Sequence, residues 1–170
     1  MSVREVWTQS HFAGIAHSHI DPKAERGTDL VFSSIHSFLS HAAMVSKMLL
    51  AKSEDPSSKS IGDILGVPVT SLVHNRKFRN HLEHYDERLK QWIKKAVMGK
   101  AIGTYNIGPK SMIVIPNMIF VSHYDPTNDT YTFVDEDFNL GELNTELVKI
   151  NNLADQWVKK MERRVIQPPF

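Results

Sequence analysis

Apolar side chains recur at helical spacing in three long segments of the chain. Residues 30–52 are apolar around most of the helical circumference, with a narrow polar strip of serines and Lys47. Residues 71–98 and 142–163 each gather their apolar side chains on one face at 100° per residue. We therefore expect three long helices, and the broad apolar surface of 30–52 places that helix at the centre of a bundle or at a subunit interface.

Two shorter segments also have helical character. Residues 5–20 mix large apolar residues with histidines, which indicates a short helix or an ordered arm. Residues 61–68 form one or two helical turns that end at Gly66 and Pro68, because these residues terminate helices.

The pattern changes after residue 98. Residues 99–111 are rich in glycine and indicate a loop, whereas 112–123 and 130–135 indicate two strands around the turn "YDPTND". Pro116 lacks an amide hydrogen, so the first strand should lie at an edge.

The predicted fold class is therefore mainly α. We expect a four- to five-helix bundle with a small β-hairpin, about 112–135, inserted before the C-terminal helix. At 170 residues the chain has the length of one domain, covering 1–170.

Composition excludes several kinds of chemistry. The chain has no cysteine, which rules out disulfides and thiolate sites, and 20 Lys and Arg nearly balance 19 Asp and Glu. Proteins that bind along a long nucleic-acid backbone usually carry an excess of basic residues, so this chain is expected to bind any nucleic acid only at a local site. No apolar run is long enough for a signal peptide or a bilayer span, so we expect a cytoplasmic protein without a membrane partner.

Charged residues are densest at 79–89, "RNHLEHYDERL". One interpretation is a solvated helix surface with ladders of weak ion pairs, and this stays open. Two details favour a site. The Asn80 amide is placed at i+4 to hydrogen-bond the His84 imidazole. Arg79 and His84 leave a helix about 140° apart, so they meet one ligand only if a second copy faces them across a two-fold axis.

The hexapeptide "RNHLEH" at 79–84 resembles the motif of the HEPN superfamily, in which four to six residues separate an arginine from a histidine on a late helix of a small bundle. The resemblance implies a homodimer whose two motifs form a composite, metal-independent ribonuclease site. It also implies a toxin or antiviral-defence effector, with a nucleotidyltransferase-type antitoxin as a possible partner.

The catalytic residues in this interpretation are Arg79, Asn80 and His84. RNA supplies the 2′-hydroxyl nucleophile, and an imidazole suits the proton transfers near neutral pH. Arg79 offers a bidentate fork to the phosphate, and Asn80 orients the imidazole or the phosphate. No cofactor or metal is required.

Flanking residues have supporting roles. Lys77, His81 and Arg88 could contact neighbouring phosphates of the RNA substrate, although a solvated stripe explains them equally well. Glu83 and Asp86 could hold Arg79 in place.

Three alternatives remain. A catalytically inactive HEPN-like module for dimerisation or protein interaction has the same motif. The pattern for a DNA-binding helix-turn-helix at 60–82 is weak, because Gly66 and Pro68 interrupt the helical spacing.

The pattern for a metal site is also weak, because the sequence contains no complete metal-binding signature. Its candidate ligands are His81, His84, Asp86, Glu87, His17 and His19. We expect His36 and His41, on the apolar helix, to be core or interface residues rather than ligands.

Overall fold

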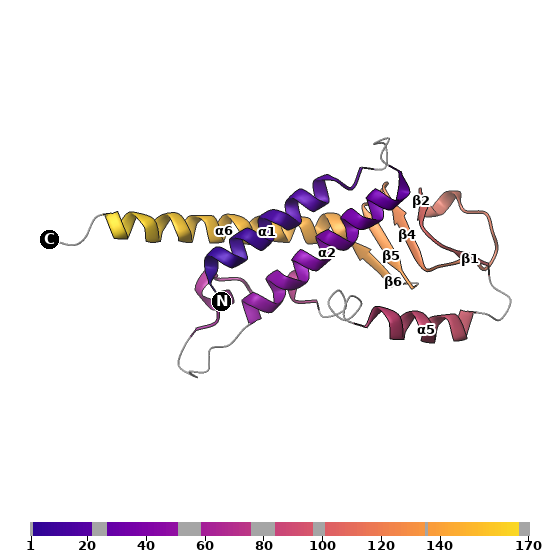
Figure 1. Ribbon diagram of the computed structural model, residues 1–170, viewed down its shortest axis with the longest axis horizontal. Helices are drawn as coiled ribbons and strands as arrows, with labels where there is room; N and C mark the ends of the chain where they lie inside the picture. The colour runs from indigo at the N-terminus through magenta and orange to yellow at the C-terminus, as the bar shows by residue number, and fades with distance from the viewer. Residues whose placement is uncertain are drawn as a thin grey trace.

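The computed structural model of the chain describes residues 2–21, 27–50, 59–75, 84–96, 101–134 and 136–166. Three long helices lie at one end and a β-sheet lies at the other, with a further helix beside the sheet (Figure 1). The helices are α1 (Val3–Ser18), α2 (Thr28–Leu50), α3 (Ile61–Leu65), α5 (Tyr85–Ala96) and α6 (Leu140–Ile166), with 3₁₀ turns η1 (Leu72–His74) and η2 (Lys110–Met112). The strands are β1 (Ile102–Gly103), β2 (Asn106–Ile107), β3 (Ile119–Phe120), β4 (Ser122–Asp125), β5 (Thr130–Phe133) and β6 (Glu136–Asn139).

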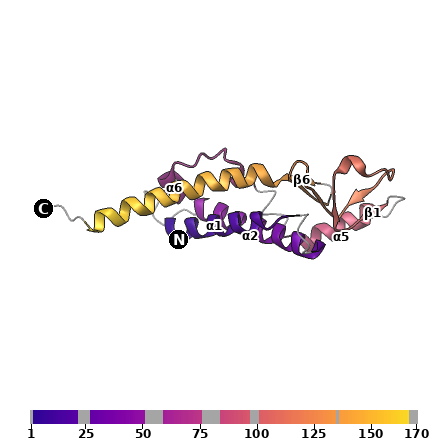
Figure 2. The ribbon, with the colours of Figure 1, turned by 90° about the horizontal axis from the view of Figure 1, so that it is seen from above.

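Helix α1 packs against both α2 and α6. It begins with a capping box, in which the Ser2 hydroxyl accepts from the Glu5 amide and the Glu5 carboxylate accepts from the Ser2 amide. When the molecule is turned by 90° about the horizontal axis of Figure 1, α6 lies on one side and α1 and α2 lie on the other (Figure 2). Asn151 of α6 links the two sides, because its amide donates to the Ser10 hydroxyl at 2.9 Å.

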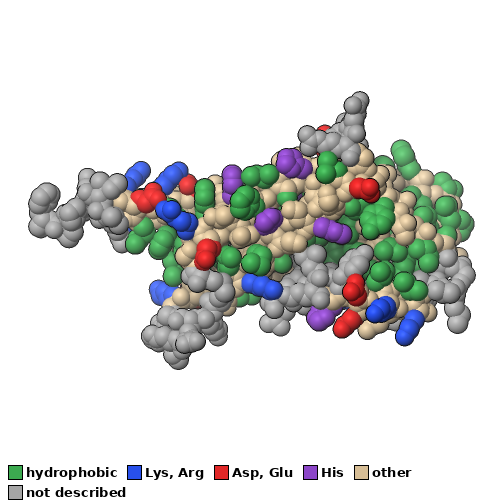
Figure 3. Space-filling model, in the orientation of Figure 1, with side chains coloured by type: hydrophobic (Ala, Val, Ile, Leu, Met, Phe, Trp, Pro, Cys, Tyr) green, Lys and Arg blue, Asp and Glu red, His purple; other side chains and the backbone are tan. Residues whose placement is uncertain are grey.

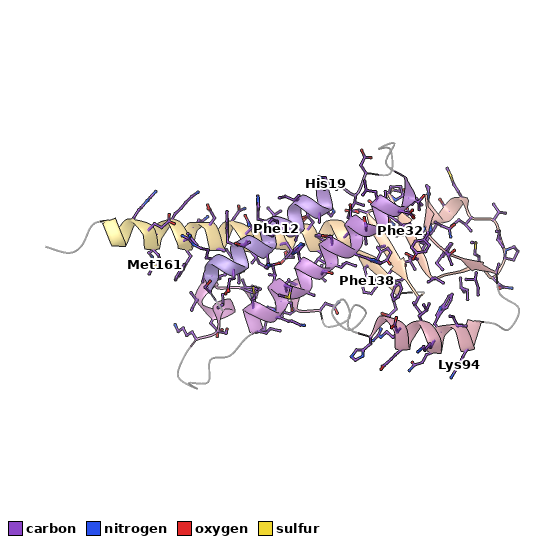
Figure 4. The ribbon with its side chains drawn as sticks, viewed as in Figure 1. Phe12, His19, Phe32, Lys94, Phe138 and Met161 are labelled. Carbon is purple, nitrogen blue, oxygen red and sulfur yellow. The ribbon has the colours of Figure 1, made fainter. Side chains whose placement is uncertain are left out.

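The main core lies between these helices and continues onto one face of the sheet. Its most deeply buried side chains come from all three long helices, and Tyr124, Tyr131, Phe133 and Phe138 extend it over the strands. Phe32 of α2 and Phe138 of β6 lie in the region where the helices meet the sheet (Figure 4). The fully buried members are Val6, Ala13, Ile35, Phe38, Val45, Leu140, Leu147 and Ala154.

Four strands form a mixed sheet in the order β2-β4-β5-β6. Strand β2 runs parallel to β4, and the other two pairs are antiparallel. Strands β1 and β3 form a separate parallel pair. Helix α5 packs Trp92 and Leu89 onto Ile119, Val121 and Val134, which form a second, smaller cluster.

The predicted helical bundle with a single hairpin is therefore wrong. Strands β4 and β5 form a hairpin, but it belongs to a mixed sheet to which β2 and β6 also contribute. Most of the strand expected at 112–123 is not β-structure, since Pro116 lies in a turn, and β4 lies between β2 and β5 and not at an edge. Residues 99–111 were expected to be a loop, yet β1 and β2 lie there. These strands have two residues each, which is too short for an alternating pattern to reveal them.

The single helix expected at 71–98 is also wrong. Leu72–His74 is a 3₁₀ turn, and Asn75 that follows it has extended backbone angles, φ −64° and ψ 107°. Helix α5 begins at Tyr85, one residue after His84. Most of the apolar residues that predicted one long helix, from Tyr85 onward, lie on α5, whereas Phe78 and Leu82 lie outside the described residues.

The other helical predictions are confirmed. Helices α1, α2 and α6 account for most of the segments expected at 5–20, 30–52 and 142–163, with α1 ending at Ser18 and residues 51–52 outside the described part of the chain. Helix α3 ends at Gly66, which has the left-handed φ of 70° that glycine adopts without strain.

The core makes a simple prediction for α6. Leu147→Ala should lower the free energy of unfolding by about 2–5 kcal/mol, because Leu147 is fully buried and the truncation leaves a cavity. Leu153→Ala on the same helix is the matched control, since Leu153 is 38% exposed and should cost much less. Urea denaturation of both variants measures the difference, and equal losses would contradict this packing of α6.

Candidate functional site

His84 lies immediately before α5 and its side chain is 55% exposed. Its carbonyl accepts the first helical hydrogen bond, from the Arg88 amide at 3.0 Å. Its Nδ1 lies 3.5 Å from Oε2 of Glu87, one turn further along the helix. The Glu87 side chain is 74% exposed, so this is a contact between two solvent-accessible groups.

Most of the other predicted site residues lie outside the described part of the chain. These are Arg79, Asn80, Lys77, His81 and Glu83. Of the remaining two, Asp86 is exposed and Arg88 is half-buried on α5. The role expected of Asn80 as the orienting partner of His84 thus stays a prediction, whereas Glu87 lies beside the imidazole.

A row of polar side chains crosses the sheet on the face opposite the main core. The strand register aligns Asn106 with His123, His123 with Thr132, and Thr132 with Asp137. Asp137 accepts hydrogen bonds from the Thr132 hydroxyl at 2.5 Å and from Lys110 Nζ at 2.6 Å. These bonds lower the pKa of the Asp137 carboxyl despite the opposing effect of burial.

His123 is the least satisfied member of this row. It is 1% exposed, and neither ring nitrogen has a hydrogen-bond partner among the described residues. The Phe120 ring lies 4.5 Å away, centroid to centroid. Burial lowers the pKa of His123 and Lys110 lowers it further, while Asp125, Asp137 and the Gly108 backbone oppose the shift. The imidazole is therefore held in its neutral form.

A second polar cluster joins the helices to the sheet on the main-core side. His17 Nε2 donates to Asp129 Oδ2 at 2.8 Å, and the Tyr124 hydroxyl donates to Asp129 Oδ1 at 2.8 Å. Burial opposes ionisation of Asp129, yet the bonds from His17 and Tyr124 lower its pKa. Burial and the Asp129 carboxylate together raise the pKa of the Tyr124 phenol, so this tyrosine stays protonated.

The two histidines of the apolar helix have partners within the protein. His36 Nε2 lies 3.4 Å from the Tyr131 hydroxyl, and burial lowers the pKa of His36. His41 Nδ1 donates to Gln9 Oε1 at 2.7 Å. Among the described residues no group of three or more histidine or acidic side chains is arranged to hold a metal ion.

Sequence reasoning missed both polar clusters on the sheet. The row of His123 could have been found from the alternation of polar and apolar residues along the strands. The polar residues that occupy every second position are His123 and Asp125, Thr130 and Thr132, and Asp137. The bond between His17 and Asp129 had no such signal, because the two residues are 112 positions apart.

No protein-family model, no curated protein and no solved structure matches the chain. No helix in the described ranges combines the length and the apolar character needed to cross a bilayer.

The burial of neutral His123 predicts how stability depends on pH. Because its folded-state pKa lies below the unfolded value of about 6.5, the unfolded chain binds more protons as the pH falls through that value, and stability drops. His123→Leu removes this proton uptake and should reduce the loss between pH 7.5 and 5.5 by about 1 kcal/mol. Urea denaturation across this pH range measures it.

His123→Gln is the matched variant, since it removes the titration but keeps a buried polar group. Both variants should flatten the pH profile, and at pH 7.5 the leucine variant should be more stable than the glutamine variant, because only glutamine keeps a buried polar group. The slope will not vanish, because burial also lowers the pKa of His36 and His74. An unchanged slope in both variants would contradict the burial of His123.

Proposed function

We propose that the chain is a metal-independent endoribonuclease of HEPN type that works in the cytoplasm as a toxin or antiviral-defence effector. The observation that supports this most is the placement of His84, whose exposed ring faces Glu87 with Nδ1. An exposed imidazole beside a carboxylate suits a general base or acid for an external polymer, because the substrate can reach it without any opening of the fold.

The proposed reaction uses RNA itself as the nucleophile. His84 Nε2 takes the proton of a 2′-hydroxyl, whose oxygen then attacks the adjacent phosphorus. The bond from phosphorus to the 5′-oxygen breaks, and that oxygen receives a proton from the second imidazole of the dimer. The products are a 2′,3′-cyclic phosphate and a 5′-hydroxyl end, and Arg79 neutralises the charge that develops on the phosphate.

A composite site needs the two copies of this region to face each other. Helix α5 lies beside the sheet, apart from the three long helices (Figure 1). Its apolar residues Leu89 and Trp92 pack onto the strands, and Lys94 points away from the sheet (Figure 4). Arg79 and Asn80 precede this helix in sequence, so we propose that they complete the site with His84, with Lys77, His81 and Arg88 along the RNA. A nucleotidyltransferase-type antitoxin would regulate it.

The second candidate is an inactive module for dimerisation or protein interaction. Three exposed apolar residues at and just after η2 favour it, because Met112 is 76%, Val114 88% and Ile115 54% exposed. Apolar side chains this accessible are typical of contacts with another protein.

The test of the proposed ribonuclease is cleavage of total RNA and tRNA by the purified protein. His84→Ala should lower the cleavage rate by about 10²- to 10⁴-fold, because general acid–base catalysis contributes that much. Glu87→Gln should cause a smaller loss with a shifted pH profile, since it changes the orientation of the imidazole. Lys94→Gln, also exposed on α5, is the matched control and should retain activity.

EDTA should leave the activity unchanged, and the products should carry 2′,3′-cyclic phosphate ends. In bacteria, wild-type expression should be toxic and His84→Ala expression should be tolerated. RNA that stays intact with wild-type protein, together with equal tolerance of both forms in cells, would favour the inactive module.

A further inference from the structure

The outer surface of α1 and α2 exposes large apolar side chains that no described element covers. Phe12 is 46% and Ile15 41% exposed on α1, and Leu30 is 40% and Met44 42% exposed on α2. Along α2, between Leu30 and Met44, the small residues Ser33, Ser37 and Ser40 are also exposed. We call this surface, formed by these seven residues with His11 and His41, the α1–α2 face.

The α1–α2 face carries no formal charge. Residues 8–18 and 30–46 contain no lysine, arginine, aspartate or glutamate, although 39 of the 170 residues of the chain are of these types, 20 basic and 19 acidic. In the space-filling view, hydrophobic and histidine side chains run along these helices, and most acids and bases gather nearer the ends of the molecule (Figure 3). A surface helix pair normally presents charged residues to solvent along its length, so their absence from these two stretches, with charges only near the helix ends, indicates a surface that is covered.

Aromatic contacts hold the side chains of the face in place. The Phe12 ring packs 5.6 Å from the His41 ring across the two helices, and His11 stacks on Trp7 at 5.6 Å. The hydrogen bond from His41 to Gln9 also crosses between the helices. Side chains that are already ordered lose little conformational entropy on binding, which favours association.

We propose that a second copy of this chain binds the α1–α2 face. In a two-fold dimer the same surface meets itself, so any charge near the axis would face its own like charge, and a face without charge avoids this repulsion. A partner of different sequence would impose no such restriction. Two helices from each copy would then form a four-helix layer, whose packing buries apolar side chains that are exposed in the single chain.

The size of the face is sufficient for a stable dimer. The uncharged part of α2, residues 30–46, spans about 25 Å at the helical rise of 1.5 Å per residue. With two helices about 10 Å apart, the contact would bury on the order of 1,200 Å² in total, which is within the range of specific interfaces.

This interface bears on the proposed ribonuclease but does not depend on it. Figure 2 shows α5 on the same side of the molecule as α1 and α2, opposite α6. A twin docked on the α1–α2 face would therefore approach α5 as well, which is the arrangement that a site shared by two copies of His84 requires.

Sedimentation equilibrium of the full chain tests the proposal. The wild type should be dimeric at micromolar concentration. Ile15→Glu and Ser37→Glu should weaken dimerisation roughly a hundredfold, since each places two like charges in one interface. Gln156→Glu adds the same charge at an exposed position of α6, on the opposite side, and should stay dimeric. Circular dichroism and thermal unfolding show that each variant is folded.

Chemical crosslinking gives an independent readout, because the chain has no cysteine of its own. Ser37→Cys treated with a short bismaleimide should yield covalent dimers, and Gln156→Cys should not. A monomeric wild type, or folded Ile15→Glu and Ser37→Glu proteins that dimerise like the wild type, would overturn the proposal. RNA cleavage is measured on the same samples, so a dimer without activity would reject the ribonuclease and leave this interface standing.

Discussion

The hydrogen bonds of Asp129 hold the sheet to the helices. One carboxylate oxygen accepts from His17 at the end of α1, and the other accepts from Tyr124 in β4. The backbone carbonyl of the same residue accepts from the amide of Leu140, the first residue of α6, at 2.8 Å. Asp129 has a left-handed φ of 51°, a conformation that aspartate tolerates better than most residues. One turn residue thus connects three elements that are distant in the sequence.

This junction explains why the two faces of the sheet differ. With α1 and α6 fixed on one side, the aromatic residues of the strands complete the main core. The other side is left with the polar row of Asn106, His123, Thr132 and Asp137. His123 is buried there without a partner among the described residues, which costs stability that the core must offset. Helix α5 packs Trp92 against Ile119 of β3, and His84, immediately before the helix, is exposed to solvent.

The long helices were predictable from sequence because each buries a stripe that repeats over many turns. Leu143, Leu147 and Ile150 of α6 are an example, since their spacing of three and four residues fits one helical face and all three are buried. Strands β1 and β2 were not predictable, because two residues carry no period and their pairing joins segments apart in sequence. Of the candidate site, exposed His84 fits the proposed role, but its partner Glu87 had been considered only as a metal ligand. The contact of His17 with Asp129 depends on the completed fold, so no local pattern could reveal it.

A double-mutant cycle between His17 and Asp129 tests the central role of this junction most directly. His17→Gln, Asp129→Asn and the double variant are unfolded with urea at neutral pH, where the bonds from His17 and Tyr124 keep Asp129 ionised. The pKa of Asp129 is lower in the folded state than the value of about 3.9 expected in the unfolded chain, so ionised Asp129 stabilises the fold. This stabilisation is fully present at neutral pH and disappears as the pH falls through the folded-state pKa. The account predicts a coupling free energy of about 1–3 kcal/mol between the two side chains. Additive effects of the two substitutions, with no coupling, would contradict it.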